Sequence, residues 1–157
     1  MTLLLVALLA GLAPARFAER PGWHVGHDRV HACPGVPRSR CQQVTSWGAT
    51  TPWRGSAERV PPHKVLAVLP RSGITIQLAL ARERNGPPEH RLAWPPRLRR
   101  DEVAGPVEGV APRIGFAGRF GRLGAFRASL WVYFGRRHPT AAQVARANAE
   151  LRTAKLP

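Results

Sequence analysis

Two segments of the chain alternate large apolar residues with polar or small ones at the period of a β-strand. These segments are residues 74–82 and 125–134. The large apolar residues that share a face are Ile74, Ile76, Leu78 and Leu80 in the first, and Phe126, Leu130, Val132 and Phe134 in the second. A period of two places alternate side chains on opposite faces of a sheet. We therefore expect two strands of a sheet with one buried side.

Weaker strand patterns occupy residues 41–47, 64–69, 91–94 and 113–120. Proline and glycine punctuate the chain between these segments, as in Pro61-Pro62 and Pro95-Pro96. Short strands separated by turns, without helical patterns between them, are typical of all-β domains. The sequence predicts a mainly β fold, either an antiparallel β-sandwich or a small barrel of about six to seven strands.

A helical pattern follows the last strand and covers about residues 140–153. Thr140 stands at the N-cap, and Gln143 at the position that completes a capping box. The apolar stripe of this segment consists of Ala141, Val144, Ala147 and Leu151. A helix of about 14 residues is marginal in water by itself. We expect it to pack on the sheet, so that residues 16–157 form one globular domain.

The N-terminus carries a ten-residue apolar run, Leu3–Leu12, followed by Ala13-Pro14-Ala15. This order is typical of a signal peptide, and it predicts that residues 1–15 are removed after Ala15. No Lys or Arg precedes the run, which departs from the usual pattern. Two alternatives stay open: a short uncleaved anchor, which would be the only membrane contact, or a core element of a cytoplasmic protein. We predict an exported protein, secreted or in the cell envelope.

The two cysteines, Cys33 and Cys41, enclose a segment rich in turn-forming residues. Such a segment brings its ends together, and an oxidising compartment would close the pair. The spacing does not match the Cys-x-x-Cys redox motif. We therefore predict a structural disulfide between them.

The charge is strongly positive, with 24 Lys and Arg against 9 Asp and Glu and a net charge of +15. Only two of the 24 are Lys, which leaves 22 Arg, a skew that fits a coding bias in part. The densest group is Arg97, Arg99 and Arg100, a candidate site for an anionic polymer and otherwise a solvated face. The arginines are not clustered with aromatic residues, which disfavours a nucleic-acid site.

Tryptophan and histidine supply two further candidate sites. Trp47 and Trp53 flank a five-residue segment and are candidates for one aromatic surface that binds polysaccharide, although large aromatics also fill small cores. The segment with His24, His27, Asp28 and His31 holds metal-ligating side chains. If it forms a strand, His27 and His31 lie about 13 Å apart, too far to share one ion. Surface histidines on a polar strand are the competing interpretation.

Catalytic signatures are absent from the sequence: it has no Gly-x-Ser-x-Gly, no Walker loop and no His-Glu-x-x-His. We expect no cofactor. The first functional hypothesis is a non-catalytic exported β-domain that binds anionic envelope material or a protein partner. The second is a metal-dependent or hydrolytic enzyme that uses residues 24–31. The third is a cytosolic nucleic-acid-binding protein.

Overall fold

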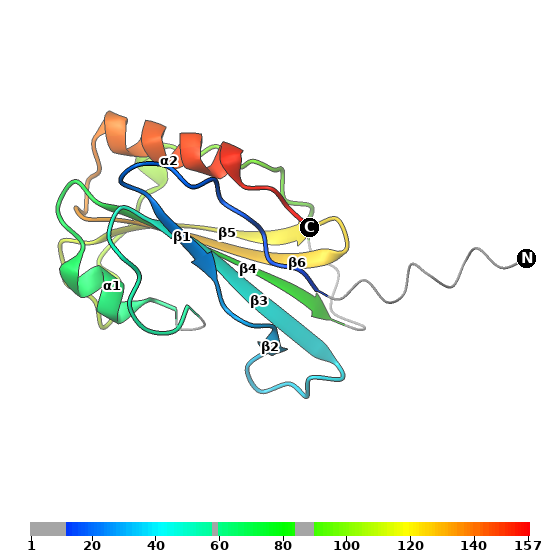
Figure 1. Ribbon diagram of the computed structural model, residues 1–157. Coiled ribbons are helices and arrows are strands. Elements are labelled where there is room, and N and C mark those ends of the chain that lie inside the picture. The colour runs from blue at the N-terminus through cyan, green and yellow to red at the C-terminus, as the bar shows by residue number, and fades with distance from the viewer. Residues whose placement is uncertain (1–11, 58–59, 84–89) are drawn as a thin grey trace, which may run out of the picture.

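An antiparallel sheet of six strands forms the centre of the molecule (Figure 1). The computed structural model describes residues 12–57, 60–83 and 90–157. The strands are β1 (His24–His27), β2 (His31–Ala32), β3 (Cys41–Ala49), β4 (Ile74–Glu83), β5 (Gly115–Leu123) and β6 (Phe126–Phe134). Their order is β1-β3-β4-β6-β5, and β2 also pairs with β3. The mainly β class is confirmed, and the strands lie in one open sheet.

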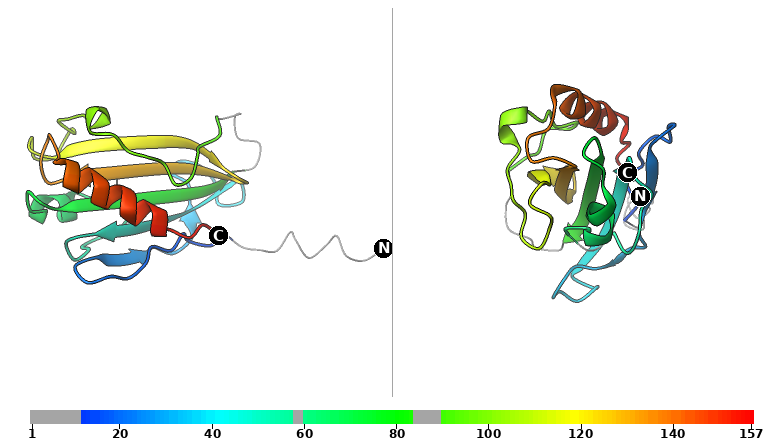
Figure 2. Two further views of the ribbon diagram at one scale, coloured as in Figure 1. Left: turned by 90° about the horizontal axis from the view of Figure 1, so that it is seen from above. Right: turned by 90° about the vertical axis from the view of Figure 1, so that its left-hand side faces the viewer.

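One face of this sheet packs against α2 (Ala141–Thr153) and the N-terminal segment 12–23 (Figures 1 and 2). These two segments cover the face that a second sheet would cover in a sandwich. The residues of this core include Ile76, Leu78 and Leu80 of β4, Val144 and Leu151 of α2, and Leu12 and Phe17 of the N-terminal segment. The predicted helix is therefore confirmed. Val144, Ala147 and Leu151 of its apolar stripe face the sheet, whereas Ala141 is exposed.

The start of α2 has the predicted capping box. The Oγ1 of Thr140 accepts a hydrogen bond from the Gln143 backbone N–H at 3.1 Å, and the Gln143 Oε1 accepts one from the Thr140 N–H at 3.0 Å. The Gln143 side chain also donates to the carbonyl of Arg71, 3.0 Å away. Because Arg71 lies in the turn before β4, this bond fixes the helix start against the sheet.

The other face of the sheet is covered by residues 50–57 and 60–69, which include α1 (His63–Val68). Leu66 and Leu69 form a second, smaller core with Ile114 and Tyr133. At the centre of this face, Gln77 is fully buried and donates to the carbonyl of Ala57 at 2.9 Å. The expectation that only one side would be buried is wrong for β4, because β4 is the middle strand and the segment after β3 crosses its polar face.

Two of the weaker strand predictions are wrong. Residues 64–69 lie mostly in α1, where the backbone N–H groups of Val65 and Leu66 donate to the carbonyl of Pro62. The apolar residues of this short segment have a spacing that also suits one buried helical face. Residues 91–94 make only the single bridge between Arg91 and Arg122, because the following Pro95-Pro96 cannot donate to a neighbouring strand.

The disulfide between Cys33 and Cys41 is confirmed, with the two Cα atoms 5.4 Å apart. It closes the connection from β2 to β3 and packs against Ala81 of β4. A disulfide is compatible with an oxidising, exported location.

The predicted leader lies mostly outside the described residues, but its last four residues are described. Leu12 and Ala15 are buried, at 6% and 1% exposure. The backbone of Arg16 forms two hydrogen bonds, each 2.9 Å long, with that of Lys155 near the C-terminus. Among the helices of the described residues, none has both the length and the apolar character to cross a bilayer.

Candidate functional site

The three clustered arginines lie beside α2, in the segment that leads into the short 3-10 helix η2 (Arg100–Glu102). Between this segment and α2 run two adjoining hollows of about 640 and 440 Å³, which share Arg97, Ala145 and Asn148. We call the two together the helix groove. Its lining residues are Pro95, Pro96, Arg97, Leu98, Arg99, Arg100, Asp101, Ala141, Val144, Ala145, Asn148 and Arg152.

Asn148 sets the position of the arginine segment on α2. Its Oδ1 accepts a hydrogen bond from the Leu98 N–H at 2.8 Å, and its Nδ2 donates to the Leu98 carbonyl at 3.0 Å. The Leu98 side chain is buried in the main core. On the helix side, Ala141 and Ala145 have small side chains, so the groove stays open between the two walls.

The arginines of the helix groove differ in their charge balance. Arg99 is bonded to Asp101 through both Nε, at 3.1 Å, and Nη2, at 2.6 Å. This contact with the carboxylate raises the pKa of Arg99. Within the described part of the chain, no carboxylate forms an ion pair with Arg97, Arg100 or Arg152. These three exposed cations therefore give the groove an uncompensated positive charge.

The structure brings the predicted pair, Trp47 and Trp53, together in a second groove of about 590 Å³, on the other side of α2 from the helix groove. Trp47 and Trp53 stack with ring centroids 4.6 Å apart and planes 18° from parallel. Both side chains are partly exposed. Trp47 lies opposite Gly26 of β1 in the strand register, and a Cβ at Gly26 would be only 2.5 Å from its ring. The Trp47 ring thus occupies the space that a side chain would fill.

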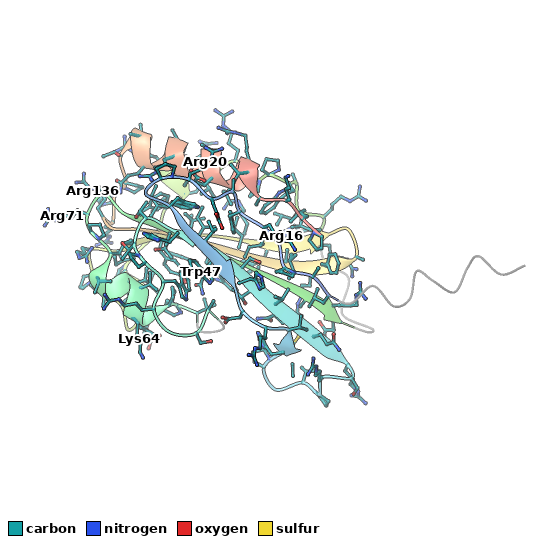
Figure 3. The ribbon with its side chains drawn as sticks, in the orientation of Figure 1. Arg16, Arg20, Trp47, Lys64, Arg71 and Arg136 are labelled. Atoms are coloured by element: carbon teal, nitrogen blue, oxygen red, sulfur yellow. A yellow bond between two sulfur atoms is a disulfide. The ribbon has the colours of Figure 1, made fainter. Side chains whose placement is uncertain are left out.

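Polar and charged side chains complete this second groove, which we call the tryptophan groove. Its lining residues are Glu19, Arg20, Pro21, Trp23, His24, Val25, Trp47, Pro52 and Trp53. The Arg20 side chain is 51% exposed, and its Nη1 lies 3.9 Å from Oε1 of Glu150. Figure 3 labels Arg20 near α2 and Trp47 near β1. The groove therefore combines an aromatic surface with a cation at its rim.

The two grooves have no lining residue in common, so the sequence candidates form two sites rather than one. Helix α2 separates them. Its residues Ala145 and Asn148 face the arginine segment, whereas Arg146 contacts the N-terminal segment, donating to the carbonyl of Gly22 and lying 5.7 Å from the Trp23 ring.

The histidine-rich segment is extended, with His24 and His27 in β1 and His31 in β2. The strand register places His24 and His27 on opposite faces of the sheet. The Nδ1 atoms of His27 and His31 lie 3.1 and 2.8 Å from the carbonyls of Asp28 and Ala32. The Asp28 carboxylate accepts a hydrogen bond from Ser56. Among the described residues, no three His, Cys, Asp or Glu side chains are grouped so that they would hold a metal ion.

Arg20, Asn148 and Arg152 line the grooves but were not singled out from the sequence. Asn148 follows Ala145 by three residues, and Arg152 follows Asn148 by four. This spacing places the three residues on one side of the helix. That spacing is a usable signal only once the arginine segment is known to pack there.

Comparison with protein-family models, curated proteins and solved structures found no match for this chain. Its function is therefore inferred from the two grooves.

Proposed function

We propose that this protein is an exported, non-catalytic binding domain that holds an acidic envelope polymer in the helix groove. The observation that carries this proposal is a set of three exposed arginines along one open groove, Arg97, Arg100 and Arg152, none of which forms an ion pair with a carboxylate of the described residues. Arginine is well suited to carboxylate, sulfate and phosphate groups because its planar fork donates two parallel hydrogen bonds.

The shape of the groove supports a polymer rather than a small anion. It follows α2 from Ala141 to Arg152, a distance of about 16 Å at the rise of an α-helix. Its lining includes no aromatic residue, and bases of single-stranded nucleic acid are bound mainly by aromatic stacking. These features favour an acidic polysaccharide over a nucleic acid.

The test compares two double variants that remove the same charge. Arg97→Gln/Arg100→Gln changes the groove, and Arg38→Gln/Arg40→Gln changes two exposed arginines in the disulfide-closed connection. We expect the groove variant to bind polygalacturonate at least about ten-fold more weakly at low salt. The control should bind nearly as the unchanged protein does, and about 0.5 M salt should weaken binding in all three.

Equal losses in the two variants would mean that binding follows net charge and that the groove is not a site. Full affinity of the groove variant for polygalacturonate would also overturn the proposal. A third outcome is that the unchanged protein does not bind polygalacturonate but binds a protein of the envelope, and that the groove variant loses this binding. The partner in the helix groove would then be a protein and not a polymer.

A further inference from the structure

We propose that the tryptophan groove binds one pyranose ring of an acidic sugar, with the C–H face of the ring on the Trp47–Trp53 pair and its carboxylate at Arg20. This site is separate from the helix groove and uses different residues. It goes beyond the proposed function because it gives the domain a second contact, in which aromatic side chains bind a single sugar ring.

The stacked pair is a rigid platform. Trp47 is held by its cross-strand position over Gly26, and Trp53 from the segment after β3 stacks on it at 4.6 Å. Pro52 adds a second flat apolar surface beside the rings. Preorganised aromatic side chains lose little conformational freedom on binding, so the contact they make with a ring-shaped ligand is retained as affinity. The C–H face of a pyranose is a flat apolar surface of the same kind.

The walls of the groove suit the hydroxyl edge of a sugar. Glu19 accepts hydrogen bonds, and Arg20 and His24 supply polar groups on the same rim. The indole Nε1 of Trp53 is shielded from water and has no hydrogen-bond partner among the described residues. Because this atom is inaccessible even to water, a sugar in the groove would contact the ring of Trp53 rather than its N–H group.

Arg20 gives the site its preference for an acidic ring. Its contact with Glu150 is long, at 3.9 Å, and half of its side chain is exposed. The guanidinium therefore retains donors that a ligand carboxylate can accept. The charge of +15 over the whole chain favours the approach of an anionic ligand in the same way.

The experiment is a titration of the full chain with trigalacturonic acid, followed by tryptophan fluorescence and by the indole N–H signals in NMR. The parallel probes are cellotriose, which is neutral, and triglutamate, which is acidic but not a sugar. We expect trigalacturonic acid to perturb Trp47 and Trp53, cellotriose to bind more weakly at the same rings, and triglutamate to leave them unchanged. Equal perturbation by triglutamate would overturn the assignment to a sugar.

Substitutions separate stacking from charge. Trp53→Ala is expected to weaken trigalacturonate binding at least about ten-fold, and Trp53→Phe to restore part of it. Arg20→Gln should weaken binding of the acidic trisaccharide and leave binding of cellotriose unchanged. The control is Phe120→Ala, which removes an aromatic side chain that is 49% exposed on β5, at the opposite edge of the sheet. It should leave the affinity for both trisaccharides unchanged. Wild-type affinity in a folded Trp53→Ala protein would overturn the proposal.

The two sites fail separately in these measurements. Arg97→Gln/Arg100→Gln should leave trisaccharide binding at the tryptophan groove unchanged, whether or not it weakens binding of the long polymer. Loss of trisaccharide binding in that variant, with Trp53→Ala unaffected, would assign the sugar to the helix groove instead.

Discussion

Two glycines in neighbouring strands determine where two tryptophan rings lie. Gly26 of β1 leaves room for Trp47 on one face of the sheet, and Gly48 of β3 leaves room for Trp23 on the other. A Cβ at Gly48 would be 2.7 Å from Nε1 of Trp23. Trp23 is buried in the main core and also lines the tryptophan groove, whereas Trp47 is partly exposed and lies in the groove. One strand pair therefore serves both stability and the candidate site.

Gly26→Ala is expected to displace the Trp47 ring, because the added Cβ would lie 2.5 Å from it. Inserting a methyl group where no space exists costs about 1–3 kcal/mol. The measurements are urea denaturation and near-UV circular dichroism, in which the coupling of the two stacked indoles should weaken. An unchanged indole spectrum in the variant would show that Gly26 does not position the ring.

The burial of Tyr133 predicts how the free energy of unfolding depends on pH in the alkaline range. Tyr133 is the only tyrosine in the chain and is 1% exposed, and this burial raises its pKa well above the ordinary value. The phenol in the unfolded chain ionises near pH 10, while in the folded protein it keeps its proton. The unfolded state therefore binds fewer protons, and stability should fall as pH rises above about 10.

The absorbance of phenolate reports this residue alone. We expect no titration of Tyr133 in the folded protein near pH 10, and a single step when the protein unfolds. Tyr133→Phe should show a smaller loss of stability over the same pH range. A reversible phenolate signal near pH 10 in protein that stays folded would contradict the expectation.

At the scale of elements, the sequence predicts the segments whose periodicity and end signals agree. For β4, β6 and α2, alternation or capping at Thr140 and Gln143 was enough to place them within a residue or two. The sequence was ambiguous for α1, because six residues rich in apolar side chains suit a strand or a short helix. The second buried face of β4 was not predictable locally, since it depends on residues 50–57 folding back over Gln77.

Helix α2 should contribute to stability rather than act as a detachable segment. Leu151 is fully buried among residues of the sheet and the N-terminal segment. Leu151→Ala is therefore expected to cost about 2–5 kcal/mol and to lower Tm by at least several degrees in calorimetry. Leu156→Ala removes the same atoms from a residue that is 36% exposed and is the matched control. Similar changes in Tm for both variants would mean that the helix does not depend on this contact.

At the scale of the whole molecule, the sequence identified two tryptophans and three arginines of the two grooves as candidates, but neither the other lining residues nor their grouping. The short separation of Trp47 and Trp53 suggested a shared surface, and the structure stacks them. The sequence shows Arg97, Arg99 and Arg100 as one cluster. Asn148 and Arg152 join them only because α2 packs beside that segment. Long-range docking of this kind leaves no local pattern, so the division into two grooves required the structure.

The N-terminal segment links folding to the predicted removal of residues 1–15. Leu12 and Ala15 are buried in the described structure, and the backbone pairing of Arg16 with Lys155 holds the segment beside the C-terminus. Cleavage after Ala15 would remove the Leu12 side chain from the core, and its burial is worth about 1.5–3 kcal/mol. The remaining contacts of Phe17 and Trp23 with the core are unaffected by that cut.

We therefore expect a chain that begins at Arg16 to fold, with a Tm several degrees below that of a chain that begins at Leu12. Leu12→Ala in the longer chain should account for most of the difference, because Leu12 is the larger of the two buried side chains that are lost. Calorimetry of the three proteins measures this, and the mass of the native exported protein shows which N-terminus is present. Equal Tm values for the two chains would mean that residues 12–15 contribute nothing to the core.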